Sequence, residues 1–229
     1  MKRHRTAARW NLPICVVLMS VLALTSACGG STPSNGSSGS NGSDAALARM
    51  QAAMKSGDCS TARKIGLQLV AADEGSGAAL TAHVVMFNCA LFAGDADEAE
   101  AQIAAFRRAP DASGVVPAMA HYLDAMLAVK TGDIAKATQT ASRAVDESER
   151  HDAPRLGAMA TAMLAGIADQ SGDCDAATRY AHQALDLNSR SDSGTVSSAI
   201  GALLGTGSSA GASSQRVDAR AHMILGSCA

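Results

Sequence analysis

The pattern of hydrophobic and polar positions divides the 229-residue chain into three parts. An apolar run from Leu12 to Ala27 follows a basic stretch, and residues 29–43 (GGSTPSNGSSGSNGS) then contain no side chain that could pack in a core. From residue 44 onward, apolar-rich stretches of helical length alternate with Gly-Asp pairs. This pattern predicts a disordered linker over residues 28–43 and an all-α domain over residues 44–229, with a Ser/Gly-rich insertion at residues 189–214.

The first 27 residues have the form of a secretory signal peptide, because a basic segment precedes an apolar run that is too short to predict a membrane span. The run ends in LTSAC, residues 24–28, which resembles the lipobox of bacterial lipoproteins, although Thr25 stands where a branched aliphatic residue is commoner. The resemblance implies that Cys28 is diacylated, becomes the mature N-terminus and anchors the chain to a membrane of the bacterial cell envelope, facing the periplasm or the exterior. An ordinary cleaved signal with a chance cysteine is the alternative.

A Gly-Asp-x-x-x-Ala pattern occurs four times, beginning at Gly57, Gly94, Gly132 and Gly172, with 37 to 40 residues between copies. Glycine permits the left-handed conformation that ends one helix, the aspartate caps the next helix, and the alanine allows the two helices to pack closely. Around the third copy, the pattern predicts helices over residues 116–130 and 134–149. Pro117 and the proline at residue 154 lie where first helices should begin.

These copies resemble the tetratricopeptide repeat, whose unit of about 34 residues has a similar turn between two helices. The likeness includes a small residue four positions before each turn glycine, and later small residues at Ala144 and Ala184, whereas Leu69 and Phe106 depart from the pattern. The large aromatic residue early in each first helix is also missing. The resemblance implies a helical-hairpin repeat solenoid of about four and a half repeats. A generic antiparallel helical bundle is the alternative. The four small residues before the turns are Ala53, Ala90, Ala128 and Ala168.

Four cysteines remain after the signal peptide and Cys28 are set aside, and an even number in an exported domain indicates disulfides. Three pairings are open from the count alone. In the register that the repeat resemblance implies, the start of a second helix lies near the end of the next first helix. The resemblance therefore predicts the bridges Cys59–Cys89 and Cys174–Cys228. Redox or metal chemistry is the alternative, but the chain has no Cys-x-x-Cys.

The composition limits both the core and the function. Aromatic residues make up 3% of the chain against 47% apolar residues, so Ala, Leu, Val, Ile and Met must build the core. Once the basic leader is removed, the 21 Asp and Glu outnumber the remaining Lys and Arg, which argues against nucleic-acid binding. The sequence has no zinc-protease, phosphate-loop or dinucleotide motif, and GSSAG at residues 207–211 is a chance match to a nucleophile motif. We expect a non-enzymatic protein without catalytic residues, metal or cofactor.

Three histidines, His83, His121 and His222, share one register of the repeat, where the tetratricopeptide family has a packing aromatic residue. We expect each to be a partly buried, hydrogen-bonded substitute for that residue. A metal or pH-sensing role is the alternative.

The repeat resemblance also implies a groove that binds peptides or partner helices, because first helices line such a groove in the family. We therefore expect an adaptor or scaffold that docks another envelope protein, with an envelope enzyme, an accessory subunit of one, or a structural surface lipoprotein as alternatives. The implied groove residues are Leu47, Gln51, Met54, Val84, Asn88, Leu91, Phe92, Met119, Tyr122, Met126, Val129, Lys130 and Met159.

Overall fold

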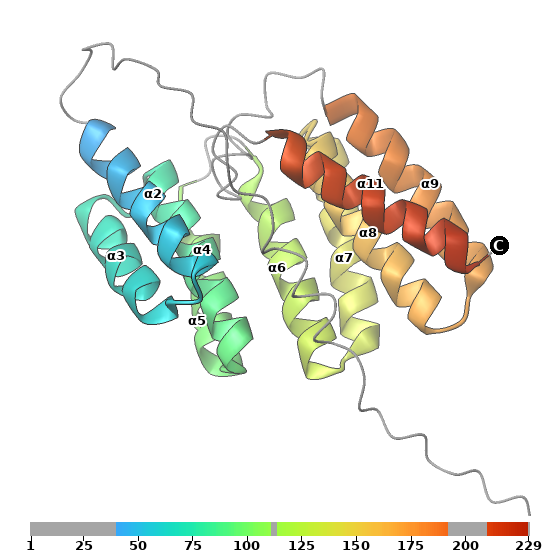
Figure 1. Cartoon of the computed structure of the whole chain (residues 1–229), viewed down its shortest axis with the longest axis horizontal. Helices are drawn as coiled ribbons and strands as arrows, with labels where there is room; N and C mark the ends of the chain where they lie inside the picture. Colours follow the sequence, from blue (N-terminus) through green and yellow to red (C-terminus); the bar gives the residue numbers. More distant parts are fainter. Residues whose placement is uncertain (1–39, 111–113, 192–209, 229) are drawn as a thin grey trace, which may run out of the picture. The chain divides into compact units, whose positions relative to one another are not determined.

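The computed structural model describes residues 40–110, 114–191 and 210–228 of the chain. The predicted signal peptide, Cys28 and most of the predicted insertion lie outside these residues. The described part contains nine α-helices and no strand, so the predicted all-α class is confirmed for it (Figure 1). The helices are α2 (Ser40–Lys55), α3 (Cys59–Ala72), α4 (Gly77–Ala93), α5 (Ala96–Arg108), α6 (Val116–Thr131), α7 (Ile134–Arg150), α8 (Pro154–Gln170), α9 (Cys174–Ser191) and α11 (Ala210–Ser227).

The helices pack in the order in which they occur along the chain. Helices α2 and α3, α4 and α5, α6 and α7, and α8 and α9 form antiparallel pairs, and each pair also contacts the next (Figure 1). Helix α11 packs against α8 and α9. The contacts between helices are therefore mostly local in sequence, between neighbours or next-but-one neighbours.

One turn geometry joins the two helices of every pair, as the turn at Gly132 illustrates. Gly132 has φ 82°, in the left-handed region, and ends α6. The N–H of Asp133 donates to the carbonyl of Ala128 at 2.9 Å, and the Asp133 carboxylate accepts from the N–H of Lys136 at 2.9 Å, which caps α7. The predicted roles of the glycine and the aspartate are thus confirmed.

The other three turns repeat these contacts. Gly57, Gly94 and Gly172 have φ 79°, 76° and 75°. The following aspartates donate to alanine carbonyls at 2.9 Å in each case, and their carboxylates accept from backbone N–H groups three residues later. At the first turn, the hydrogen bond from the Thr61 N–H lowers the pKa of Asp58. The donor–acceptor pairs are Asp58–Ala53, Asp95–Ala90 and Asp173–Ala168.

The small residue that follows each turn is fully buried between paired helices, as Ala62, Ala99, Ala137 and Ala177 all have no exposed surface. Side chains without a large Cβ substituent let the two helix axes approach closely, which a chain poor in aromatic residues needs in order to fill its core. Larger residues fill the later position in the first two pairs, where Leu69 and Phe106 are buried in place of alanine.

The observed boundaries of α6 and α7 agree with the predicted helices to within one residue at each end. Pro117 lies in the first turn of α6 and Pro154 begins α8, as predicted. Helix α2 begins at Ser40, inside the segment assigned to the linker, and α9 and α11 both extend into the segment assigned to the insertion. Composition does not locate these boundaries, because small polar residues are tolerated at helix ends, where backbone groups lack partners inside the helix.

Helix α11 is fastened to its neighbours near both of its ends. Near its start, the Asn188 Nδ2 atom of α9 lies 2.8 Å from Ser214 Oγ and 2.8 Å from Asp218 Oδ1. Beyond its end, a disulfide joins Cys228 to Cys174 at the start of α9. Between these points, Val217, Ala221 and Ile224 are buried against α8 and α9. These contacts attach α11 to α8 and α9, although 18 residues of chain lie between the end of α9 at Ser191 and the start of α11 at Ala210.

Candidate functional site

The residues predicted to line a groove all lie on α2, α4, α6 and α8, the first helices of the four pairs. Two of them, Val84 and Met119, are buried in a core cluster that α4, α5 and α6 share, so they are not available to a partner. Phe92, Val129 and Lys130 are exposed. The remaining members are partly buried: Leu47, Gln51, Met54, Asn88, Leu91, Tyr122, Met126 and Met159.

Tyr122 and Met126 have a packing role in addition to any contact with a partner. Both side chains pack against the cluster around α4 to α6 and also against the cluster around α6 to α8. Burial raises the pKa of the Tyr122 phenol, and the positive charge of Arg220 on α11 offsets part of that rise. Substitution of either residue would therefore disturb the core.

Arg220 reaches α8 at a glycine. A Cβ atom added to Gly166 would collide with the Arg220 guanidinium, so the absence of a side chain at Gly166 creates the space that Arg220 occupies. The sequence alone does not single out Arg220, because the contact joins two helices with the insertion between them.

A small cleft lies between the end of α4 and the end of α6, with a volume of about 110 Å³. Leu91 and Lys130, both predicted groove residues, contribute to its wall. The cleft therefore marks a place where the side chains of two successive first helices leave space between them. Its lining residues are Leu91, Gly94, Asp95, Ala96, Leu127, Lys130 and Thr131.

Large apolar side chains are exposed close to this cleft in the sequence. Phe92 is 57% exposed, Val129 is 36% exposed and Ile134 is 40% exposed. Ile134, the first residue of α7, was not among the predicted groove residues. The sequence does contain a signal for Ile134. A large aliphatic residue follows the Gly-Asp pair only in this copy, whereas the other three copies have Ala or Cys at that position. The remaining exposed large apolar residues in the described part are Leu67 and Met223.

The three histidines of shared register have different environments. His83 is buried, and its Nδ1 lies 2.8 Å from Gln102 Oε1, so the predicted burial and hydrogen bond are confirmed there. Gln102 Nε2 donates to Glu98, which pairs with Arg63 at 3.1 Å, and this chain of contacts connects α3, α4 and α5. His222 is exposed on α11, so the same prediction is wrong for it.

His121 is partly buried, but its Nδ1 has no hydrogen-bond partner among the described residues. Burial lowers the pKa of His121, nearby Arg107 and Arg143 lower it further, and Asp124 and Glu147 act in the opposite direction. Arg107 and Asp124 form an ion pair between α5 and α6. In the described residues, no three His, Cys, Asp or Glu side chains come together in a way that could hold a metal ion.

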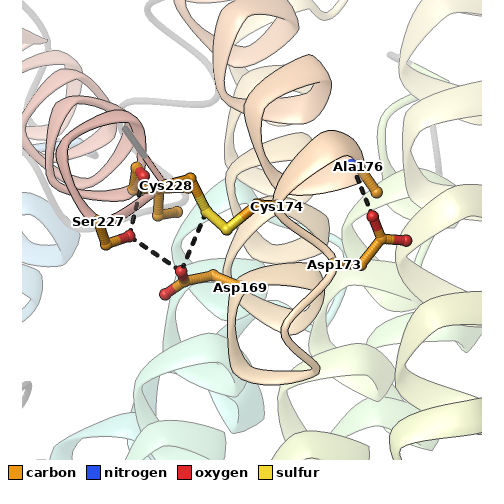
Figure 2. Close-up of a disulfide and its surroundings, with 7 residues drawn as sticks. Asp169, Asp173, Cys174, Ala176, Ser227 and Cys228 are labelled. Carbon is orange, nitrogen blue, oxygen red and sulfur yellow. Dashed lines mark hydrogen bonds between the residues drawn. A yellow bond between two sulfur atoms is a disulfide. The ribbon is translucent and has the colours of Figure 1, made fainter.

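Both predicted disulfides are present. The Cα atoms of Cys59 and Cys89 are 5.4 Å apart, and those of Cys174 and Cys228 are 5.3 Å apart. Figure 2 shows the second bridge beside Asp169, whose carboxylate accepts a hydrogen bond from Ser227 Oγ at 2.9 Å. Two disulfides indicate an oxidising, extracytoplasmic location for the domain.

No protein-family model matches the chain, and a search of curated proteins finds no significant relative. The structure itself defines the class of protein. The described residues form an all-helical domain in which antiparallel helix pairs pack in sequence order and two disulfides are present. Among the described helices, none has both the length and the hydropathy needed to cross a bilayer. The lipidation predicted at Cys28 lies outside the described residues.

Proposed function

We propose that this chain is a lipid-anchored, non-enzymatic adaptor or scaffold of the bacterial cell envelope. It binds another envelope protein, or an extended segment of one, through the first helices of a tetratricopeptide-like solenoid. The observation that carries the proposal is the fourfold recurrence of one turn, with a left-handed glycine and the same aspartate-to-alanine hydrogen bond. Equal turns give successive first helices the same register, which is the basis of a continuous binding face in repeat proteins.

The distribution of exposed apolar residues supports this proposal. Phe92 and Val129 lie near the ends of α4 and α6, two successive first helices. Ile134 follows directly after the turn that ends α6. Exposed large apolar side chains at the ends of successive helices are candidates for contact with another molecule. The two disulfides support the extracytoplasmic address, and the LTSAC segment supports the lipid anchor.

The partner is tested by chemical cross-linking in cells that make the protein, followed by purification and mass spectrometry. The test variant carries Phe92→Ser and Val129→Ser, because both side chains are exposed and their loss spares the core, unlike loss of Tyr122 or Met126. Leu67→Ser is the matched control, since Leu67 is 52% exposed but lies on a second helix, α3. We expect the wild type and the Leu67→Ser control to capture the same partner protein, and the double variant to capture much less of it.

Two other outcomes contradict the proposal. Equal capture by all three proteins would place the contact away from the first helices. Capture of no partner by the wild type would argue against an adaptor.

The anchor is tested separately with Cys28→Ala. Loss of the acylated thiol should move the protein from membranes to the soluble fraction, because acyl chains provide the membrane affinity. Continued tight membrane association of the variant would show that the lipobox interpretation is wrong.

A further inference from the structure

The cleft between α4 and α6 has the dimensions of a site for one side chain. Its volume of about 110 Å³ is below the range of roughly 300 to 1,000 Å³ that is typical of small-molecule pockets. It is comparable with an apolar cavity of about 150 Å³ that holds a benzene ring. Leu91, Ala96 and Leu127 supply apolar surface to the cleft. The cleft therefore suits an aliphatic or aromatic side chain rather than a free metabolite.

The polar side chains of the cleft differ in whether they already have partners. Thr131 Oγ1 donates to the carbonyl of Leu127 at 3.0 Å, and the Asp95 carboxylate accepts from the N–H of Glu98 at 3.0 Å. The exposed ammonium group of Lys130 has no hydrogen bond or ion pair within the described part of the chain. The cleft therefore has one acidic side chain, Asp95, which caps the start of α5, and one basic side chain, Lys130, which is left to pair with an acidic group of a partner beside the apolar surface.

We infer that this cleft is an anchor point of the proposed binding face, which takes an apolar side chain of a partner segment whose neighbouring acidic side chain pairs with Lys130. The inference rests on the proposed function and names the chemistry of the partner. Exposed Phe92 and Val129 adjoin the cleft residues Leu91 and Lys130 in sequence and extend the apolar contact beyond the cleft. Burial of the apolar side chain supplies most of the affinity, while the exposed charge supplies selectivity and faster association.

The test uses the full chain purified in detergent and a library of random heptapeptides displayed on phage. The wild type should enrich peptides in which an aliphatic or aromatic residue has Asp or Glu within two positions. Lys130→Glu should enrich Lys or Arg beside the apolar residue, because the charge at the cleft is reversed. Lys64→Glu, an exposed site on α3 away from the cleft, is the matched control and should select as the wild type does.

A synthetic peptide from the wild-type selection then provides an affinity by fluorescence anisotropy. Lys130→Gln should weaken its binding by about two- to fivefold, the scale of an ion pair at an exposed rim. Lys130→Glu should weaken it further, and Lys64→Glu should leave it unchanged. Phe92→Ser should also weaken it, since apolar contact is lost.

Several results would overturn the inference. The enriched peptides could show no preference for acidic residues, or could show one that Lys130→Glu leaves unchanged. Either result would show that Lys130 does not determine which peptides bind. If Phe92→Ser still abolished the binding of these peptides, the proposed binding face would be supported and only the inferred pairing with Lys130 would be wrong. No enrichment would reject the anchor point, while cross-linking in cells would decide the adaptor function independently. Self-association that Lys130→Glu abolishes would identify the occupant as a second copy of this chain and would also reject the inference.

Discussion

His83 on α4 and Gln102 on α5 are joined by a buried contact of 2.8 Å between Nδ1 and Oε1. Because Gln102 uses its amide nitrogen to donate to Glu98, its oxygen is the acceptor, which requires a proton on His83 Nδ1. A polar side chain of α4 is thus buried, and α5 supplies the hydrogen-bond partner that offsets the cost of burying it.

Loss of one partner should cost more than loss of both. Gln102→Leu leaves a buried imidazole N–H unsatisfied and should lower the free energy of unfolding by about 1–3 kcal/mol. Replacement of both groups, by His83→Phe with Gln102→Leu, should recover much of this loss, because the buried polar atoms are then gone. Urea denaturation of the two single variants and the double variant measures the coupling. Additive losses in the double variant would show that the contact contributes nothing.

The Cys174–Cys228 bridge should matter most for the last turns of α11. Replacement of both cysteines by alanine should lower the free energy of unfolding by about 2–4 kcal/mol, because the unfolded chain regains the entropy of an open loop. Amide hydrogen exchange should accelerate near Ser227 and change little near Ser214, where Asn188 still holds the helix. Equal acceleration along all of α11 would contradict this division between its two ends. Replacement of Cys59 and Cys89 provides the comparison, since that bridge lies away from α11.

Gly157 of α8 lies against Ser148 of α7 where these two helices pack. A Cβ atom at Gly157 would be 2.6 Å from Ser148 Oγ, and that hydroxyl is buried and donates to the carbonyl of Val145 at 2.7 Å. Gly157→Ala should therefore destabilise the domain by about 1 kcal/mol, despite the higher helix propensity of alanine. Addition of Ser148→Ala removes the clashing oxygen and should restore stability.

Gly77→Ala is the matched control for this glycine, because nothing lies within 4 Å of a Cβ atom at that position in α4. It should raise the melting temperature slightly through helix propensity alone. A stabilising effect of Gly157→Ala without the serine change would show that α7 and α8 have room to separate.

Acidification should weaken the fold through His121. Its pKa is lowered in the folded protein, chiefly by burial and then by Arg107, so the unfolded chain binds the proton more readily. Stability should therefore fall as the pH drops below about 6.5, the ordinary histidine value, and should level off below the folded pKa.

Urea denaturation at pH 7.5 and pH 5.5 tests the role of His121, with His121→Gln as the variant. This substitution should reduce the pH dependence, whereas His182→Gln, at an exposed site on α9, serves as the control. A pH dependence that persists in His121→Gln would assign it to other groups. A proton titration of the His121 ring by NMR should give a pKa below the ordinary value.

The sequence by itself determined the features that are encoded within a few consecutive residues. The four Gly-Asp-x-x-x-Ala copies located the turns, because the left-handed glycine, the capping aspartate and the small alanine act over a single turn of chain. The limits of α6 and α7 followed from the same signals. The cysteine count left three disulfide pairings open, and the pairing that the repeat resemblance implied is the one observed.

Only the tertiary structure decided which side chains of one register are buried and which are free. His83 gained a partner from α5, His121 has none among the described residues, and His222 is exposed. Val84 is buried and Phe92 is exposed, although both belong to the same predicted groove. The physical reason is that the burial of a side chain depends on which side chains of the neighbouring helices cover it or bind to it. Those side chains are distant in sequence.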